Sequence, residues 1–241
     1  MEECGRASFS KEALPAYHRP KGGAPVKVVA INASPRKEWN TATLLDHALK
    51  GAASRGAETE IYHLYDYYYT GCISCFACKR IGGSSYGKCA VKDELRPILE
   101  SAQKADALIL GSPIYFGCTT GMMRSFLERL LFPNILYDAD HSTTFGRRMP
   151  VGLIYTMNTD EKYYASTYLR NERDTSSMLE RILGPVEALA SFETYQFDDY
   201  SKYETSAFSE PERRERREKV FPKDCKKAFA MGQRLTQHEG K

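Results

Sequence analysis

The sequence lacks two features that would point to a membrane or to a nucleic acid as partner. It has no apolar run long enough to cross a bilayer, so we expect no membrane-spanning segment. It also lacks an excess of charge, because 34 Lys and Arg residues against 31 Asp and Glu residues leave a formal net charge of +3. Such a balance gives no general attraction to nucleic acid. The composition therefore favours small-molecule partners.

A secretory signal is also missing from the start of the sequence. Residues 1–27 mix charged residues with Pro and Gly and contain no apolar core of the kind that such a signal requires. We therefore expect a cytoplasmic location, where thiols are normally kept reduced. The seven cysteines are an odd number, so at least one would stay unpaired even in an oxidised chain. Both observations argue against a disulfide framework.

The two commoner phosphate-binding signatures are absent as well. A P-loop ends in Gly-Lys-Ser/Thr and a dinucleotide fingerprint opens a helix with G-x-G-x-x-G, but neither follows the first apolar run. The stretch INASPR (residues 31–36) also lacks the paired aspartates of a receiver domain, which disfavours a phosphate-responsive regulator. No internal repeat is visible. Any phosphate site must therefore be of another kind.

Apolar runs and helical periodicity alternate along the chain. The run VKVVAINAS (residues 26–34) is continuous and β-branched, as expected of a parallel strand that is covered on both faces. The pattern predicts further strands at residues 58–65, 107–115, 149–157 and 186–197, and helices at residues 41–56, 93–106, 121–131 and 163–183. Five strands that alternate with helices predict an α/β protein with an open, doubly wound parallel sheet.

Two segments lie outside this alternation. Residues 1–25 have no periodicity and predict an irregular N-terminal arm, whereas residues 198–241 predict a helical C-terminal tail in which Pro222 interrupts or restarts the helix. Glutamates alternate in the tail with four arginines, a pattern more typical of a solvated helix face than of a nucleic-acid patch: Arg213, Arg214, Arg216 and Arg217. We expect one domain over residues 26–197, with the C-terminal extension packed on it.

Polar residues follow the first predicted strand, at the end where an open parallel sheet binds ligands. Amides at a helix N-terminus are unpaired donors with a positive partial charge, so hydroxyls and amides gathered there can surround a phosphate. Arg36 could add a charged contact. The polar residues are Ser34, Asn40, Thr41 and Thr43. Two of these, Asn40 and Thr41, could instead merely cap the helix, and this loop alone leaves both interpretations open.

The loop after the third strand reads GSPIYFGCTTGMM (residues 111–123) and combines small residues with two aromatic ones. A flat aromatic ligand could lie along its backbone, with amides facing the ligand's polar edge and a ring facing its plane. The alternative is an ordinary turn from strand to helix whose aromatic side chains fill the core.

Four of the seven cysteines lie between residues 72 and 89. The spacing C-x2-C-x2-C lets three thiolates converge on one iron-sulfur cubane, with a fourth supplied from further along. Zinc also takes four thiolates, but its knuckles are usually two separated pairs, so the pattern favours iron-sulfur over zinc. Plain reduced thiols are a third interpretation. The four residues are Cys72, Cys75, Cys78 and Cys89.

Three stretches taken together resemble the NADPH-dependent FMN reductase superfamily, and within it most closely the iron-sulfur flavoproteins. They are INASPRKEWNTATLL, GCISCFAC…GKCAVKDELRPIL and ADALILGSPIYFGCTTGMMRSFLERL. The resemblance covers about residues 26–160. It implies a flavodoxin-like fold with strand order 2-1-3-4-5 and one FMN per subunit.

The resemblance also implies roles for particular residues. Residues of the first loop would surround the FMN phosphate: Ser34, Arg36, Asn40, Thr41 and Thr43. Residues of the second would run beside the isoalloxazine ring: Pro113, Ile114, Tyr115, Phe116 and Gly117. The stretch YTMN resembles, more weakly, a third flavin-contacting loop and contributes Thr156 and Asn158.

In iron-sulfur flavoproteins the clustered cysteines bind a [4Fe-4S] cluster, which implies Cys72, Cys75, Cys78 and Cys89 as ligands here. The ten residues from Lys79 to Lys88 exceed the usual family gap and put the fourth ligand in doubt. This Gly- and Ser-rich insertion could loop out without moving its ends.

These observations predict an FMN-dependent oxidoreductase in which a [4Fe-4S] cluster exchanges electrons with the flavin and NAD(P)H is a possible transient donor. The flavin would perform the chemistry, so no catalytic side chain is named. We expect small-molecule or protein electron partners and a homodimer or homotetramer. The alternatives are a cluster-free NAD(P)H-dependent FMN or quinone reductase and a non-catalytic flavodoxin-like shuttle.

Overall fold

The computed structural model describes residues 25–140 and 142–237, so the predicted N-terminal arm lies almost wholly outside the described residues. The strands are β1 (Lys27–Asn32), β2 (Glu58–His63), β3 (Ala107–Tyr115), β4 (Cys118–Thr119), β5 (Val151–Thr156) and β6 (Val186–Ser191). The α-helices are α1 (Asn40–Ala53), α2 (Leu95–Lys104), α3 (Gly121–Leu131), α4 (Glu161–Tyr163), α5 (Leu169–Ile182), α6 (Glu210–Lys219) and α7 (Phe221–Leu235).

Five strands form one parallel sheet in the order β2-β1-β3-β5-β6, and the two-residue β4 pairs antiparallel with β3. The predicted doubly wound fold and strand order are therefore confirmed, with β4 added beside the five. The central strands β1, β3 and β5 are almost entirely buried, because helices cover both of their faces.

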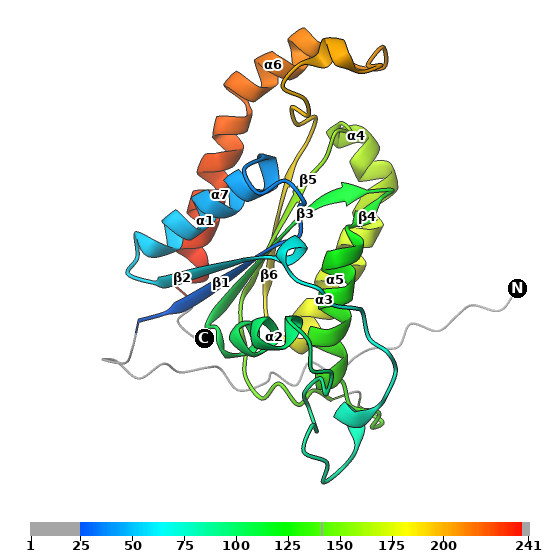
Figure 1. The fold of residues 1–241 in the computed structure, drawn as a ribbon. Coiled ribbons are helices and arrows are strands. Elements are labelled where there is room, and N and C mark those ends of the chain that lie inside the picture. The colour runs from blue at the N-terminus through cyan, green and yellow to red at the C-terminus, as the bar shows by residue number, and fades with distance from the viewer. Residues whose placement is uncertain (1–24, 141, 238–241) are drawn as a thin grey trace, which may run out of the picture.

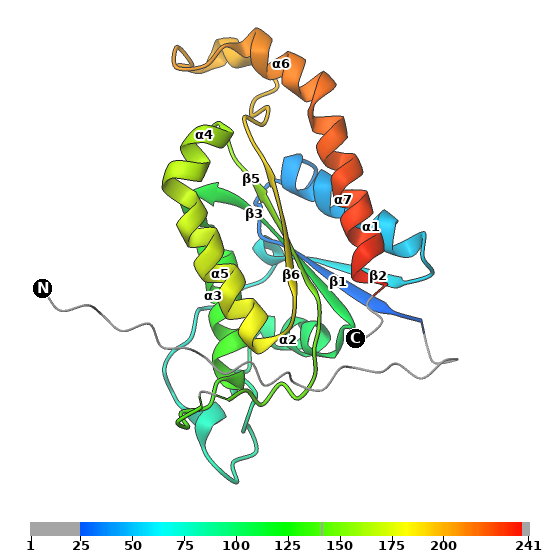
Figure 2. The same cartoon turned by 180° about the vertical axis from the view of Figure 1, so that it is seen from behind.

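Two hydrophobic cores lie on opposite faces of the sheet. Helices α1 and α7 cover one face, and α2, α3 and α5 cover the other (Figures 1 and 2). Alternate residues of β1 supply both cores: Val28 and Ala30 face α1 and α7, whereas Val29 and Ile31 face the other helices. The continuous apolar run of this strand thus serves two cores at once.

The fifth predicted strand is shorter than expected. Residues 186–197 were expected to be extended throughout, but β6 ends at Ser191. Glu193 then takes a left-handed conformation (φ 49°), and Thr194 donates its backbone N–H to Met157 O at 3.0 Å. Past Ser191, apolar residues continue without strand pairing: the ring of Phe192 packs on Tyr164, and the ring of Tyr195 packs on Tyr200.

The C-terminal tail is helical, and Pro222 lies in the first turn of α7, where its missing N–H costs no hydrogen bond. Helix α7 packs closely against α1 through glycines. A Cβ added at Gly232 would lie 1.8 Å from Ala48 O, and one added at Gly51 would lie 1.9 Å from Phe229 O. The two backbones therefore touch where any larger side chain would separate them.

Replacing Gly232 by alanine is expected to destabilise the protein by about 3 kcal/mol, because its methyl group meets backbone that cannot move aside. Urea unfolding followed by circular dichroism measures the loss. The control is Gly121→Ala, since nothing lies within 4 Å of a Cβ added there. Equal stability of the Gly232 variant and the parent would contradict the close contact between α1 and α7.

Candidate functional site

The carboxyl ends of β1, β3 and β5 meet at one edge of the sheet, and the loops that follow them are tied together. Thr120 Oγ1, at the start of α3, donates to Ala33 O in the β1–α1 loop at 2.9 Å. The hydroxyls of Thr41 and Thr156 lie 2.8 Å apart and are buried. Segments far apart in the sequence therefore form one polar edge, near the top of the sheet in Figure 1.

The amino terminus of α1 lies in this edge. Its N-cap residue, Trp39, makes no capping hydrogen bond with its side chain, and the first turn contains no acidic residue. Asn40, Thr41 and Ala42 are nevertheless buried. Amides at such a terminus have no acceptor within the helix and carry positive partial charge. The side chains of Asn40 and Thr41 bind Tyr195 O and Thr156 Oγ1 rather than helix amides, so the simple capping alternative does not hold, and the amides suit an anion.

The side chains predicted around a phosphate mostly bind other protein groups. Arg36 stacks on Trp39 with 4.1 Å between its Cζ and the ring centroid, and it donates to Gln196 O at 2.6 Å. Asn40 donates to Tyr195 O at 2.8 Å, and Thr43 donates to Trp39 O at 2.9 Å. These side chains fix the shape of the loop, which leaves the helix amides as its main free donors.

Ser34 also shapes the loop. Its backbone N–H donates to Asn32 Oδ1 at 2.9 Å, and its hydroxyl accepts the N–H of Arg36 at 3.1 Å. The side chain is 5% exposed. It therefore closes a tight turn immediately after β1, facing the same edge as the amides of α1.

Arginines of the C-terminal extension reach this loop, which the sequence did not suggest. Arg217 donates to Asn40 Oδ1 at 2.8 Å, and Arg216 donates to Phe192 O at 2.6 Å. Arg213 lies 2.9 Å from Glu193 Oε1. The expectation of a solvated helix face is thus wrong for these three side chains, because the loop after β6 runs under α6.

The stretch after β3 forms a hairpin rather than a simple turn into a helix. Phe116 and Gly117 are its two turn residues, with φ values of 50° and 81°, and Ile114 and Tyr115 pair with Thr119 and Cys118. Positive φ at both turn positions matches the right-handed twist of a two-residue hairpin. The Phe116 side chain is fully exposed, so it does not fill the core.

Neighbouring elements hold the hairpin in place. Asn171 on α5 donates to Gly117 O at 2.9 Å, and Ser112 Oγ accepts the N–H of Thr120 at 3.1 Å. A Cβ added at Gly117 would lie 2.9 Å from the Tyr168 ring. Pro113 and Ile114 are half-buried at its base, so the hairpin presents backbone and aromatic side chains to the edge of the sheet. Asn158 is also half-buried, two residues beyond β5.

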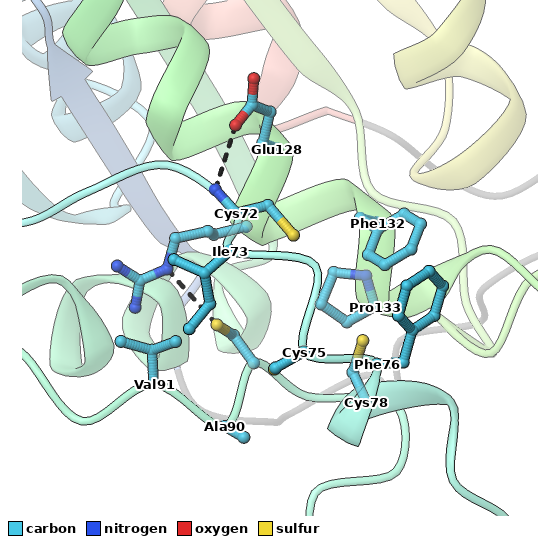
Figure 3. A pocket seen from close by; sticks show the side chains of 12 residues that line it. Cys72, Ile73, Cys75, Phe76, Cys78, Ala90, Val91, Glu128, Phe132 and Pro133 are labelled. Atoms are coloured by element: carbon cyan, nitrogen blue, oxygen red, sulfur yellow. Dashed lines mark hydrogen bonds between the residues drawn. The ribbon is translucent and has the colours of Figure 1, made fainter.

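A second feature, the cysteine loop (residues 70–92), lies at the other end of α3 (Figure 1). Its four cysteines line one hollow together with residues at the end of α3 (Figure 3). Cys72 and Cys75 are exposed, Cys89 is half-buried and Cys78 is buried. The insertion between Cys78 and Cys89 thus loops out and returns, and Gly87 donates its N–H to Cys78 O at 3.0 Å.

Strained backbone separates the first three cysteines. Ser74 and Phe76 both adopt left-handed conformations, with φ values of 52° and 55°. Such conformations cost non-glycine residues about 1–3 kcal/mol each and persist where the surroundings or a function require them. The left-handed residues between the cysteines turn the chain so that Cys72, Cys75 and Cys78 border the same hollow.

Two basic side chains lie beside the hollow. Arg129 on α3 is fully buried, and its Nε lies 3.3 Å from Cys89 Sγ. Lys79 Nζ donates to Phe132 O and Ile135 O, and it lies 4.4 Å from the Phe132 ring centroid. Burial raises the pKa of the Cys78 thiol, and the charge of Lys79 opposes this rise.

The donor set fits a thiolate-bound metal centre better than a hard cation. Four thiols line the hollow, and its one carboxylate, Glu128, already accepts the N–H of Cys72 at 3.1 Å. Nowhere in the described part of the chain do three or more His, Cys, Asp or Glu side chains stand close enough to hold an ion. The sulfurs would therefore have to turn inward to bind one, and the exposed Cys72 and Cys75 have room to do so.

Helix α3 separates the two features. Thr120 caps its start beside the hairpin, and Arg129, nine residues later, lies beside the cysteines. At 1.5 Å per residue this spans about 14 Å.

The open parallel sheet, with a buried helix terminus that lacks a side-chain cap after its first strand and an exposed hairpin after its third, belongs to the class of α/β proteins that bind ligands at the carboxyl ends of their strands. Residues 26–160 match the family described as NADPH-dependent FMN reductase, which is more than half of the chain. The chain belongs to this family, and the predicted resemblance is confirmed.

Curated relatives align with a little under half of the chain. The chain is 39% identical over 104 residues to an iron-sulfur flavoprotein of Methanocaldococcus jannaschii, an alignment that covers 43% of this chain and 51% of the relative. It is equally identical over 104 residues to an iron-sulfur flavoprotein of Archaeoglobus fulgidus, which covers 43% of this chain and 48% of the relative. The chain thus spans about half the length of the curated relatives it matches.

Solved structures share the fold. An NAD(P)H:quinone oxidoreductase from Methanothermobacter marburgensis superposes with a TM-score of 0.65 at 14% identity, covering 89% of this chain and 99% of that one. An azoreductase from Bacillus anthracis gives 0.61 at 12% identity, covering 87% and 99%. At such identities the likeness concerns the fold alone.

No helix in the described part of the chain combines the length and the hydrophobicity that crossing a bilayer requires.

Proposed function

We propose that the protein is an FMN-dependent oxidoreductase that accepts electrons from NAD(P)H and carries a [4Fe-4S] cluster on its cysteine loop. The observation that carries the proposal is the buried, uncapped amino terminus of α1 beside the β3–β4 hairpin. The names of the curated iron-sulfur flavoproteins support the cluster.

The amides of Asn40, Thr41 and Ala42 would bind the FMN phosphate, and Ser34 would complete that side of the site. Arg36, held by Gln196 O and Trp39, contributes a positive charge. Two of the predicted ligands, Asn40 and Thr43, act through the shape of the loop, because their side chains already bind protein acceptors.

The backbone from Pro113 to Gly117 would lie beside the flavin ring, with Thr156 and Asn158 approaching from β5. Bound FMN supplies the hydride and single-electron chemistry. The chain's own residues bind and orient it, and the exposed side chains of Tyr115 and Phe116 leave one approach to the site open for a donor or acceptor.

Cys72, Cys75, Cys78 and Cys89 would hold the cluster, which supplies one-electron transfer when bound. Arg129 and Lys79 would offset its negative charge. We also propose that the protein assembles as a homodimer or homotetramer and exchanges electrons with small molecules or proteins in the cytoplasm.

The test is made on protein purified without exposure to air. We expect it to contain FMN, iron and acid-labile sulfide, and we expect NADPH or NADH to bleach the flavin band in an anaerobic stopped-flow experiment. Flavin without iron and sulfide would favour the cluster-free reductase. Flavin that neither nucleotide reduces would favour the shuttle, and colourless protein that does not bind added FMN would overturn the proposal.

A further inference from the structure

Arg129 is a buried charge, and almost all N–H groups of its guanidinium donate a hydrogen bond. Its NH1 and NH2 groups lie 2.5 and 2.8 Å from the two carboxylate oxygens of Asp93, and NH1 also donates to Thr70 O at 3.1 Å. The remaining Nε–H donates to Cys89 Sγ at 3.3 Å. A fully buried guanidinium is costly unless it is paired in this way.

The Asp93 pair fixes the direction of Nε. Because the guanidinium is planar, a carboxylate bound to both terminal nitrogens leaves Nε–H only one direction. That direction is occupied by sulfur rather than by a backbone oxygen. A neutral thiol is a weak acceptor, whereas a metal-bound thiolate is a much better one. The arrangement is therefore best satisfied when Cys89 is a thiolate ligand.

We propose that Arg129 is a positioning residue of the cysteine loop: it holds Cys89 as the fourth cluster ligand and raises the cluster's reduction potential through the Nε–H···Sγ hydrogen bond. The inference rests on the proposed function in its cluster-bearing form. It also bears on the ten-residue gap between Cys78 and Cys89, which put the fourth ligand in doubt. The hydrogen bond from Arg129 holds Cys89 Sγ at the hollow, and this selects Cys89 as that ligand.

The effect on potential follows from charge. Reduction adds one electron to the cluster and no proton to Arg129, which stays charged in both states. An N–H donor to a ligand sulfur stabilises the more negative, reduced state more than the oxidised one. Loss of the donor is therefore expected to make the cluster harder to reduce.

The variants are Arg129→Lys, which keeps a charge but loses the planar fork, and Arg129→Gln, which loses both. The control is Arg124→Gln, because Arg124 lies on the same helix but is exposed. Iron and sulfide content and an EPR-monitored potentiometric titration are measured for each. We expect both Arg129 variants to raise the ratio of oxidised to reduced cluster about tenfold at a given potential, which means a reduction potential lower by about 59 mV for one electron. The control should shift this ratio little.

A measurement on the unmodified chain does not depend on whether the variants fold. In protein labelled with ¹⁵N-arginine, pulsed EPR of the reduced cluster is expected to contain a coupling to an arginine nitrogen. An intact cluster with no such coupling, or Arg129 variants with unchanged potential, overturns the inference and leaves the proposed function standing. Absence of iron and sulfide from the parent overturns the cluster itself.

Discussion

Replacing Cys75 by serine is expected to reduce bound iron and acid-labile sulfide at least about tenfold. Mutation of a residue that hydrogen-bonds to a metal ligand already lowers metal affinity about 10- to 100-fold, and loss of a ligand itself should lower it no less. Cys75 is the best cysteine for this test, since it is exposed and its substitution leaves no cavity in the core. FMN content should stay unchanged, because the cysteine loop and the hairpin lie at opposite ends of α3. Metal analysis and flavin release measure the two quantities on one sample.

The matched control is Cys118→Ser. Cys118 is also exposed, but it lies in the β3–β4 hairpin rather than in the hollow. We expect this variant to keep its iron and sulfide. If Cys75→Ser retained both, the ligand set would be wrong. If the parent contained zinc in place of iron, the alternative use of the four thiolates would hold.

The fold could be predicted from the sequence because its strongest signals are local. The buried strand at residues 26–34 and the helix that follows it were both predicted. The strand is recognisable because central parallel strands need apolar residues on both faces. The β3–β4 hairpin could not be read in the same way. Its turn residues are Phe116 and Gly117, whereas two-residue hairpin turns usually contain Asn-Gly or Asp-Gly.

The candidate site was predicted only as far as its residues are neighbours in sequence. The cysteines were proposed from their spacing and the β1–α1 loop from its place after the first strand, but the residues that support them were not. Arg129 meets Asp93 and Cys89, which lie 36 and 40 residues away, and nothing in its own helix marks it as buried. Arg217 reaches Asn40 across 177 residues, so its contact depends on where the tertiary fold brings α6.

Replacing Ser34 by aspartate is expected to weaken FMN binding at least about 100-fold, or about 2.8 kcal/mol. An aspartate can still accept the N–H of Arg36, as Ser34 does at 3.1 Å, so the turn should survive. The new carboxylate would face the phosphate at the terminus of α1. Two unit charges about 4 Å apart repel by about 4 kcal/mol at an effective dielectric constant near 20, which exceeds what one lost neutral hydrogen bond would cost.

Riboflavin separates this electrostatic effect from damage to the fold, because it has the same ring and no phosphate. We expect Ser34→Asp to bind riboflavin as well as the parent does, and Ser34→Ala, which adds no charge, to lose FMN affinity only a few-fold. Titration of the apoprotein followed by flavin fluorescence gives all of these affinities. Equal losses for FMN and riboflavin in Ser34→Asp would mean that the loop had collapsed, whereas unchanged FMN affinity would place the phosphate elsewhere than at the amino terminus of α1.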